Sequence, residues 1–125
     1  MIDETEINRG LVLHLDPDVL VGFGATYSCD DTRRVTSGHF FLCLRVVGET
    51  GEWLPLYTKP GPGRIGILED GRSGHPKWTD GDCYYHPEQV WAASHAAVVN
   101  AAQAGHDKSE PEHRNSLAEG HIPEL

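Results

Sequence analysis

The side chains best suited to chemistry lie at one end of a strongly apolar segment. Residues 39–47 are apolar after His39 except for Arg45, and residues 53–58 are apolar up to Thr58. The two runs are separated by a glycine-rich turn, and together they predict an antiparallel β-hairpin. His39 and Thr58 then lie at the same end of the hairpin, so an imidazole and a hydroxyl come close together.

Basic side chains surround this end of the hairpin. Arg33 and Arg34 lie on the loop that leads into the first strand, and Arg64 begins the next predicted strand. Cleavage of RNA without a metal needs a base for the ribose 2′-OH, cations for the charge on phosphorus and an acid for the leaving oxygen. His39 is the candidate base or acid, Arg34 or Arg64 holds phosphate, and Thr58 orients the substrate. The candidate catalytic residues are His39, Thr58, Arg34 and Arg64.

The same end also suits binding without catalysis, to a phosphate or to an acidic peptide. Aromatic side chains anchor interfaces, although they also fill cores. The aromatic residues that can form either a groove or a core are Trp53, Tyr57, Trp78, Tyr84 and Trp91. The candidate binding residues are Arg33, Lys59, Trp78 and Lys77.

A metal site is the third alternative, because the chain has eight histidines. Cys83 and His86 have the spacing of half a zinc site, and His75 lies just upstream. No second pair with ligand spacing follows. We therefore predict no metal ligand and no cofactor, and keep a small metal-binding protein as the alternative.

Composition limits the cellular setting and the partners. Three widely spaced cysteines give no disulfide framework, which favours a reduced, cytoplasmic protein. The acidic start and the lack of a long apolar run argue against a signal peptide and a membrane span. The net charge of −9 excludes general coating of nucleic acid. Residues 33–78, however, hold seven basic and four acidic side chains, a net charge of +3 that favours a local anion-binding face.

The 125 residues are enough for one domain. We expect a flexible N-terminus over 1–9, a single domain over 10–105, and a mobile or draping tail over 106–125, of which 107–125 are dispensable for folding.

A strand is expected at 11–15 and a strand or inward-packed loop at 19–23. Residues 24–38 are the longest predicted loop, and the hairpin turn is expected at 48–52. Further strands are expected at 64–68, 83–85 and 88–92, with a loop over 72–82 that Trp78 anchors.

One helix is predicted, at 95–104, with Ser94 as N-cap and Gly105 as the stop signal. A single helix over 88–104 is the alternative. Short strands with one late helix predict a mainly β fold, a small, strongly bent antiparallel barrel of the SH3-like type.

The order of these elements resembles the PemK/MazF-like toxins of toxin–antitoxin systems, which have SH3-like barrels. The resemblance covers roughly residues 8–104, and its parts are Gly10-Leu11-Val12-Leu13, the arginine-bearing loop and apolar strand from Arg33 to Val47, Pro55-Leu56-Tyr57-Thr58, Gln89-Val90 and the terminal helix. It implies a metal-independent endoribonuclease that forms a homodimer and is neutralised by an antitoxin peptide. The residues themselves require only a binding module for a protein partner or for single-stranded RNA.

Overall fold

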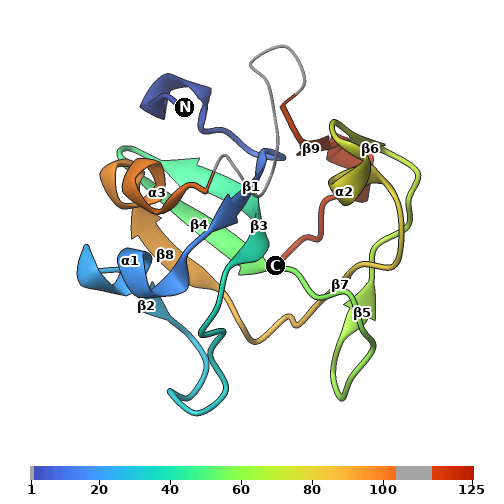
Figure 1. Ribbon diagram of the computed structural model, residues 1–125, viewed down its shortest axis with the longest axis horizontal. Helices are drawn as coiled ribbons and strands as arrows, with labels where there is room; N and C mark the ends of the chain where they lie inside the picture. The colour runs from blue at the N-terminus through green and yellow to red at the C-terminus, as the bar shows by residue number, and fades with distance from the viewer. Residues whose placement is uncertain (1, 104–113) are drawn as a thin grey trace.

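A computed structural model describes residues 2–103 and 114–125. Its centre is a five-stranded antiparallel sheet with the strand order β1-β3-β4-β8-β2 (Figure 1). The mainly β fold is therefore confirmed. The closed SH3-like barrel is not: within the described residues the sheet stays open, with β1 and the two-residue β2 as its edges. The strands are β1 (Val12–Leu15), β2 (Thr26–Tyr27), β3 (His39–Val47), β4 (Thr50–Pro55) and β8 (Trp91–Ser94).

The predicted hairpin is formed by β3 and β4, with Phe41 opposite Pro55 and Val47 opposite Thr50. The five-residue turn expected at 48–52 is wrong, because β4 already begins at Thr50. Gly48 adopts a φ of 63°, the left-handed conformation that suits glycine in so short a turn.

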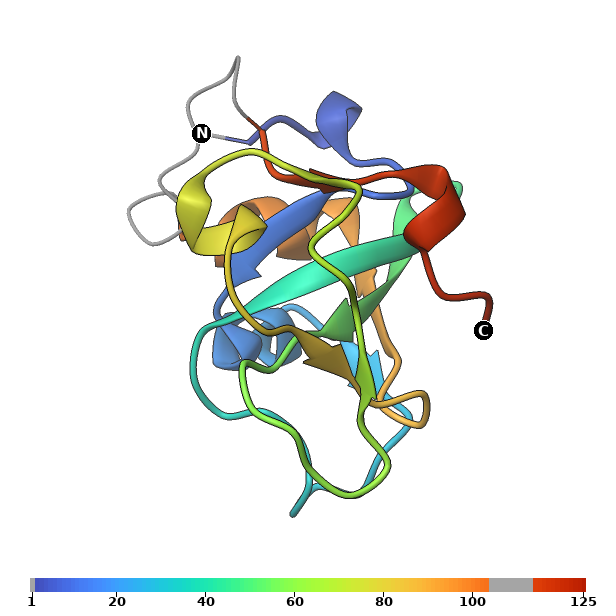
Figure 2. The ribbon, with the colours of Figure 1, turned by 90° about the vertical axis from the view of Figure 1, so that its right-hand side faces the viewer.

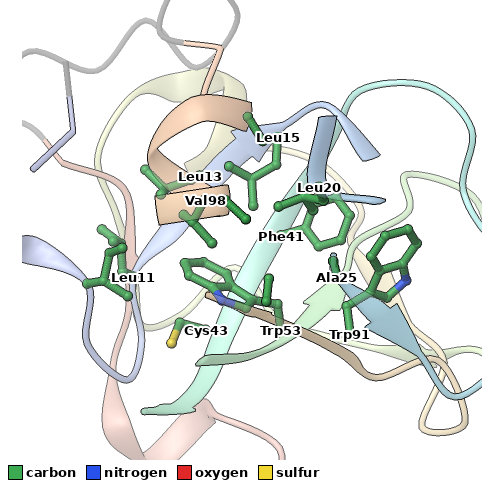
Figure 3. Packing of buried hydrophobic residues seen from close by; sticks show 14 of the residues in the cluster. Leu11, Leu13, Leu15, Leu20, Ala25, Phe41, Cys43, Trp53, Trp91 and Val98 are labelled. Atoms are coloured by element: carbon green, nitrogen blue, oxygen red, sulfur yellow. The ribbon is translucent and has the colours of Figure 1, made fainter. Parts of the chain in front are cut away.

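Both faces of the central sheet are covered, which explains why β3 is apolar on both faces from Phe40 to Leu44. Successive side chains of a strand point to opposite faces. Phe41 and Cys43 accordingly join one buried cluster, together with Trp53 (Figure 3), while Leu42 and Leu44 join the other.

Helices cover the first face, and one of them replaces the strand or loop expected at 19–23. Helix α1 (Pro17–Gly22) begins there because the Asp16 side chain accepts a hydrogen bond from the Asp18 amide at 2.9 Å, with proline at the first position. Helix α3 (His95–Ala101) begins where predicted, with Ser94 Oγ accepting from the Ala97 amide at 3.1 Å. A strand followed by a helix is thus confirmed over a single helix from 88; residues 104 and 105 lie outside the described part.

Short elements cover the second face. The predicted strands at 64–68 and 83–85 are the pair β5 (Ile65–Gly66) and β7 (Tyr84–Tyr85). The expected loop at 72–82 contains a strand and a helix. The strand is β6 (Arg72–Ser73) and the helix is α2 (Pro76–Thr79), and this face also carries β9 (Ser116–Leu117) and the 3-10 turn η3 (Glu119–His121). The 3-10 turn η1 (Glu4–Glu6) instead contacts α3 on the first face. None of the helices described is both long and apolar enough to cross a membrane.

Both described ends pack onto the body. Ile2 and Ile7 are buried at the N-terminus, which the sequence predicted to be flexible. The C-terminal segment crosses the second face, where β9 pairs with β6 and buries Leu117 and Ile122 (Figure 2). Residues 114–125 therefore drape over the core and complete it, and we no longer expect them to be dispensable. Residues 106–113 of the predicted tail lie outside the described residues.

Candidate functional site

A cleft of about 450 Å³ lies at one end of the molecule. The loop between β2 and β3 and the loop between β4 and β5 both extend to this end (Figures 1 and 2). Residues of both loops line the cleft, joined by two residues from the segment between β7 and β8. The side chains that bring charge or hydrogen-bonding groups include Arg33, Arg34, His39, Tyr57, Arg64, His86 and Gln89.

His39 is positioned by the hairpin. Its ring meets that of Tyr57 edge to face, with centroids 5.5 Å apart, so the contact of His39 with the end of the partner strand is made by Tyr57. The Nδ1 atom of His39 lies 2.7 Å from the carbonyl oxygen of Ser37. Because a carbonyl only accepts, this contact places the proton of a neutral His39 on Nδ1. Nε2 then carries the lone pair, as a general base requires.

Tyr57 and Arg64 form a stacked pair in the wall of the cleft. The guanidinium carbon of Arg64 lies 3.7 Å from the centre of the Tyr57 ring, and Arg64 Nη1 donates to the Lys59 carbonyl at 3.0 Å. The Tyr57 hydroxyl donates to Oε1 of the buried Gln89. Burial raises the pKa of Tyr57, so the phenol keeps its proton at neutral pH and serves as a fixed donor.

Positive charge dominates this cleft. Arg34 bonds to Asp18 at 2.9 Å and Arg33 lies 3.8 Å from Glu88, but neither carboxylate is among the residues that line the cleft. In the described part of the chain, no carboxylate lies within 4.0 Å of Arg64. The arrangement therefore suits an anion, even though the protein as a whole is acidic.

The structure brings together four of the predicted site residues: Arg33, Arg34, His39 and Arg64. The exposed Thr58 and Lys59 lie in an adjoining hollow of about 440 Å³, which His39 and Arg64 also line.

The other two predicted binding residues lie elsewhere. Trp78 is 2% exposed, and its indole donates to the Ser116 carbonyl at 2.9 Å, so it anchors the second core cluster and offers no face to a partner. Lys77 lies beside Trp78 and outside the cleft.

Sequence reasoning misses the contribution of His86 and Gln89 to the cleft. The sequence pattern marks His86 only as a zinc ligand, and Gln89 only as part of the family resemblance. A usable signal is the repeated His-Pro dipeptide, at His75 and at His86. In both, Nδ1 accepts from the amide two residues further on, at 3.1 Å.

The zinc alternative has no site among the residues described, where no three metal-ligating side chains lie close enough together. Burial raises the pKa of the Cys83 thiol to about 11. Without a metal the sulfur therefore stays protonated at neutral pH.

Comparison of the chain with protein-family models, with curated proteins and with solved structures finds no match.

Proposed function

We propose that this protein is a nucleic-acid-binding domain whose cleft holds the phosphate backbone of single-stranded RNA. The observation that supports this most strongly is the presence of three arginines, Arg33, Arg34 and Arg64, in one cleft of a protein with a net charge of −9. Guanidinium groups match phosphate in charge and in geometry.

The stacked Tyr57–Arg64 pair favours RNA over an acidic peptide. Unpaired bases stack on aromatic rings and on guanidinium planes, and only a single strand exposes its bases in this way. The Arg64 guanidinium over Tyr57 offers such a plane beside the phosphate-binding arginines. Thr36 and Ser37 line the same cleft, and their hydroxyls suit a ribose. An acidic peptide would also pair with the arginines, but it has no base to stack on the Arg64 plane and no ribose to bond to the two hydroxyls.

The acidic remainder of the protein limits the affinity without preventing binding. At physiological salt the Debye length is about 8 Å, so distant carboxylates are largely screened. The arginines of the cleft act at contact distance and keep most of their effect. We therefore expect binding of moderate strength that weakens as the salt concentration rises.

The test is the fluorescence anisotropy of a labelled, mixed-sequence single-stranded RNA, measured in EDTA over a range of salt. The double variant Arg33→Gln/Arg64→Gln should bind at least about tenfold more weakly, and its salt slope should fall by ~0.7 for each phosphate that an arginine no longer neutralises. Arg9→Gln is the matched control, because Arg9 pairs with Glu119 outside the cleft. Absence of RNA binding by the wild type, or a preference for an acidic peptide, would overturn the proposal.

Metal-independent RNA cleavage is the second candidate, and the tautomer of His39 favours it. Nε2 of His39 would take the proton of a ribose 2′-OH, whose oxygen attacks the adjacent phosphorus. The bond to the 5′-oxygen then breaks, and that oxygen takes a proton from water. The products are a 2′,3′-cyclic phosphate and a 5′-hydroxyl, with Thr58 orienting the substrate from the adjoining hollow. The PemK/MazF-like resemblance belongs to this proposal, with its homodimer and antitoxin partner.

Cleavage is tested in EDTA by following a labelled RNA on a denaturing gel. His39→Ala should lose about 10²-fold or more in rate while melting as the wild type does. The exposed His121 provides the matched control, His121→Ala. If the wild type yields no cyclic phosphate, this candidate fails while RNA binding stands.

We also propose that the protein works in the cytoplasm. Cys29, Cys43 and Cys83 are all free thiols, which a reducing compartment preserves. Titration under denaturing conditions should find all three thiols in protein purified without reductant, and an intermolecular disulfide would contradict the assignment.

A further inference from the structure

Each ring nitrogen of His86 faces a hydrogen-bond donor. Nδ1 lies 3.1 Å from the amide nitrogen of Glu88, and Nε2 lies 3.1 Å from Nη2 of Arg33. An amide N–H and a guanidinium only donate, whereas a neutral imidazole has a single acceptor nitrogen. One of the two contacts therefore joins two donors and lacks an acceptor.

The contact with Glu88 is the one that the backbone fixes. A turn closes around it, with the Gln89 amide donating to the His86 carbonyl at 3.0 Å. His75 repeats the arrangement: it too precedes a proline, and its Nδ1 accepts from the Lys77 amide at 3.1 Å. Arg33 is a long side chain, 45% exposed, and is held less firmly. Nδ1 of His86 is therefore the acceptor, and Nε2 carries the proton.

Two donors thus converge inside the cleft, the Nε2–H of His86 and the guanidinium of Arg33. His86 is only 7% exposed, so bulk water does little to satisfy its N–H. The carboxylate of Glu88 approaches the other terminal nitrogen of Arg33, Nη1, at 3.8 Å and leaves Nη2 to face His86. These two donors lack a shared acceptor, and an oxygen atom with several lone pairs would accept hydrogen bonds from both.

Gly63 packs closely against the imidazole of His86. A Cβ atom at this position would lie 2.5 Å from Nε2 of His86, closer than side-chain atoms normally approach. Gly63 also has a φ of 74°, a conformation that other residues rarely adopt. The glycine therefore lets the loop between β4 and β5 approach the ring of His86, which lines the cleft together with Arg33.

We propose that His86 and Arg33 form a phosphate subsite, in which one phosphate oxygen accepts from both His86 Nε2 and Arg33. This inference rests on the proposed function, since the phosphate is then one group of the bound RNA backbone. Arg33 supplies the charge, and the Nε2–H of His86 supplies a directed donor.

The first test is the two-bond ¹H–¹⁵N NMR spectrum of the histidine rings, recorded while inorganic phosphate is added to the wild-type protein. His86 should carry its proton on Nε2 before the addition, and its Nε2 signal should shift as phosphate binds. His75 has the same local turn away from the cleft and should not shift. A proton on Nδ1 of His86, or an unchanged His86 signal at saturating phosphate, would overturn the subsite.

The second test is His86→Asn. Asparagine keeps an acceptor for the Glu88 amide, because it is a good cap, and its shorter side chain places no donor at the position of Nε2 beside Arg33. We expect about tenfold weaker binding of both phosphate and RNA. The matched variant, His75→Asn, should leave both unchanged.

RNA binding by His86→Asn and the phosphate-induced shift of His86 distinguish a failure of the subsite from a failure of the proposed function. If His86→Asn binds RNA as tightly as the wild type, the subsite fails and the function stands. If phosphate shifts His86 but no RNA binds, the subsite stands and the function fails. If His86→Asn does not fold, the wild-type spectra decide the question.

Discussion

The guanidinium carbon of Arg64 lies 3.7 Å from the centre of the Tyr57 ring, so the planar cation is stacked on the phenol. If RNA binds in the cleft, this stack predicts that Arg64 contributes to RNA affinity by its planar shape as well as by its charge. Arg64→Lys keeps the charge and removes the plane on which a base can stack. Stacking is worth about 1–3 kcal/mol for each base, so RNA affinity should fall roughly tenfold or more while the salt slope stays the same. Anisotropy titrations at several salt concentrations measure both, and equal affinity for the two proteins would contradict the prediction.

The C-terminal segment should contribute strongly to stability. Leu117 is 3% exposed and Ile122 is 6% exposed, both in the second core cluster. Leu117→Ala and Ile122→Ala should each lower the free energy of unfolding by about 2–4 kcal/mol, because each removes buried side-chain volume. Leu125→Ala is the control, since that side chain is 42% exposed. Urea denaturation followed by tryptophan fluorescence measures the change. Losses below about 0.5 kcal/mol would show that the segment is loosely attached.

Sequence reasoning succeeded where one local segment holds the whole signal. The run from Phe40 to Val47 is apolar except for Arg45, and so long an apolar run suits a central strand buried on both faces. Sequence reasoning left the C-terminal segment open between a mobile and a draping tail, because Leu117 and Ile122 stand as isolated apolar residues in a polar segment and show no period. Their burial depends on β6, far away in the chain, and nothing local reveals that pairing.

The candidate site divides in the same way. His39 and the arginines were predictable because the hairpin and its flanking loops place them at one end. His86 reaches the cleft from a segment about fifty residues beyond Arg33, so spacing could not bring them together. The prediction of a strand or loop at residues 19–23 was wrong for a different reason. The pair Asp16-Pro17 can end a strand or begin a helix, and in this protein it begins helix α1.

The two faces of β3 should be about equally sensitive to truncation. Phe41 packs against the helices and Leu44 against the opposite layer, and both are 0% exposed. We expect Phe41→Ala and Leu44→Ala each to cost about 2–5 kcal/mol in the free energy of unfolding. Val47→Ala, on the same strand but 70% exposed, should cost less than about 0.5 kcal/mol. Urea denaturation of the three variants measures the costs. A small loss at either buried site would mean that the layer on that side is not packed against the sheet.

Stability should fall at alkaline pH because of two buried thiols. Burial raises the pKa of Cys43 to about 12 and that of Cys83 to about 11, from an ordinary value of 9.0. Above pH 9 the unfolded chain releases these protons while the native protein keeps them. Fewer protons are then bound by the unfolded state, so the free energy of unfolding decreases as the pH rises.

The decrease should approach ~1.4 kcal/mol per pH unit for each thiol between about pH 9 and pH 11. Urea denaturation at several pH values measures it in the wild type and in Cys43→Ala/Cys83→Ala. The variant will be less stable near neutral pH, but its stability should depend less on pH above 9. Tyr57, whose pKa is also raised, is present in both proteins and cancels in the comparison. Parallel curves above pH 9 would show that neither thiol is held protonated by burial.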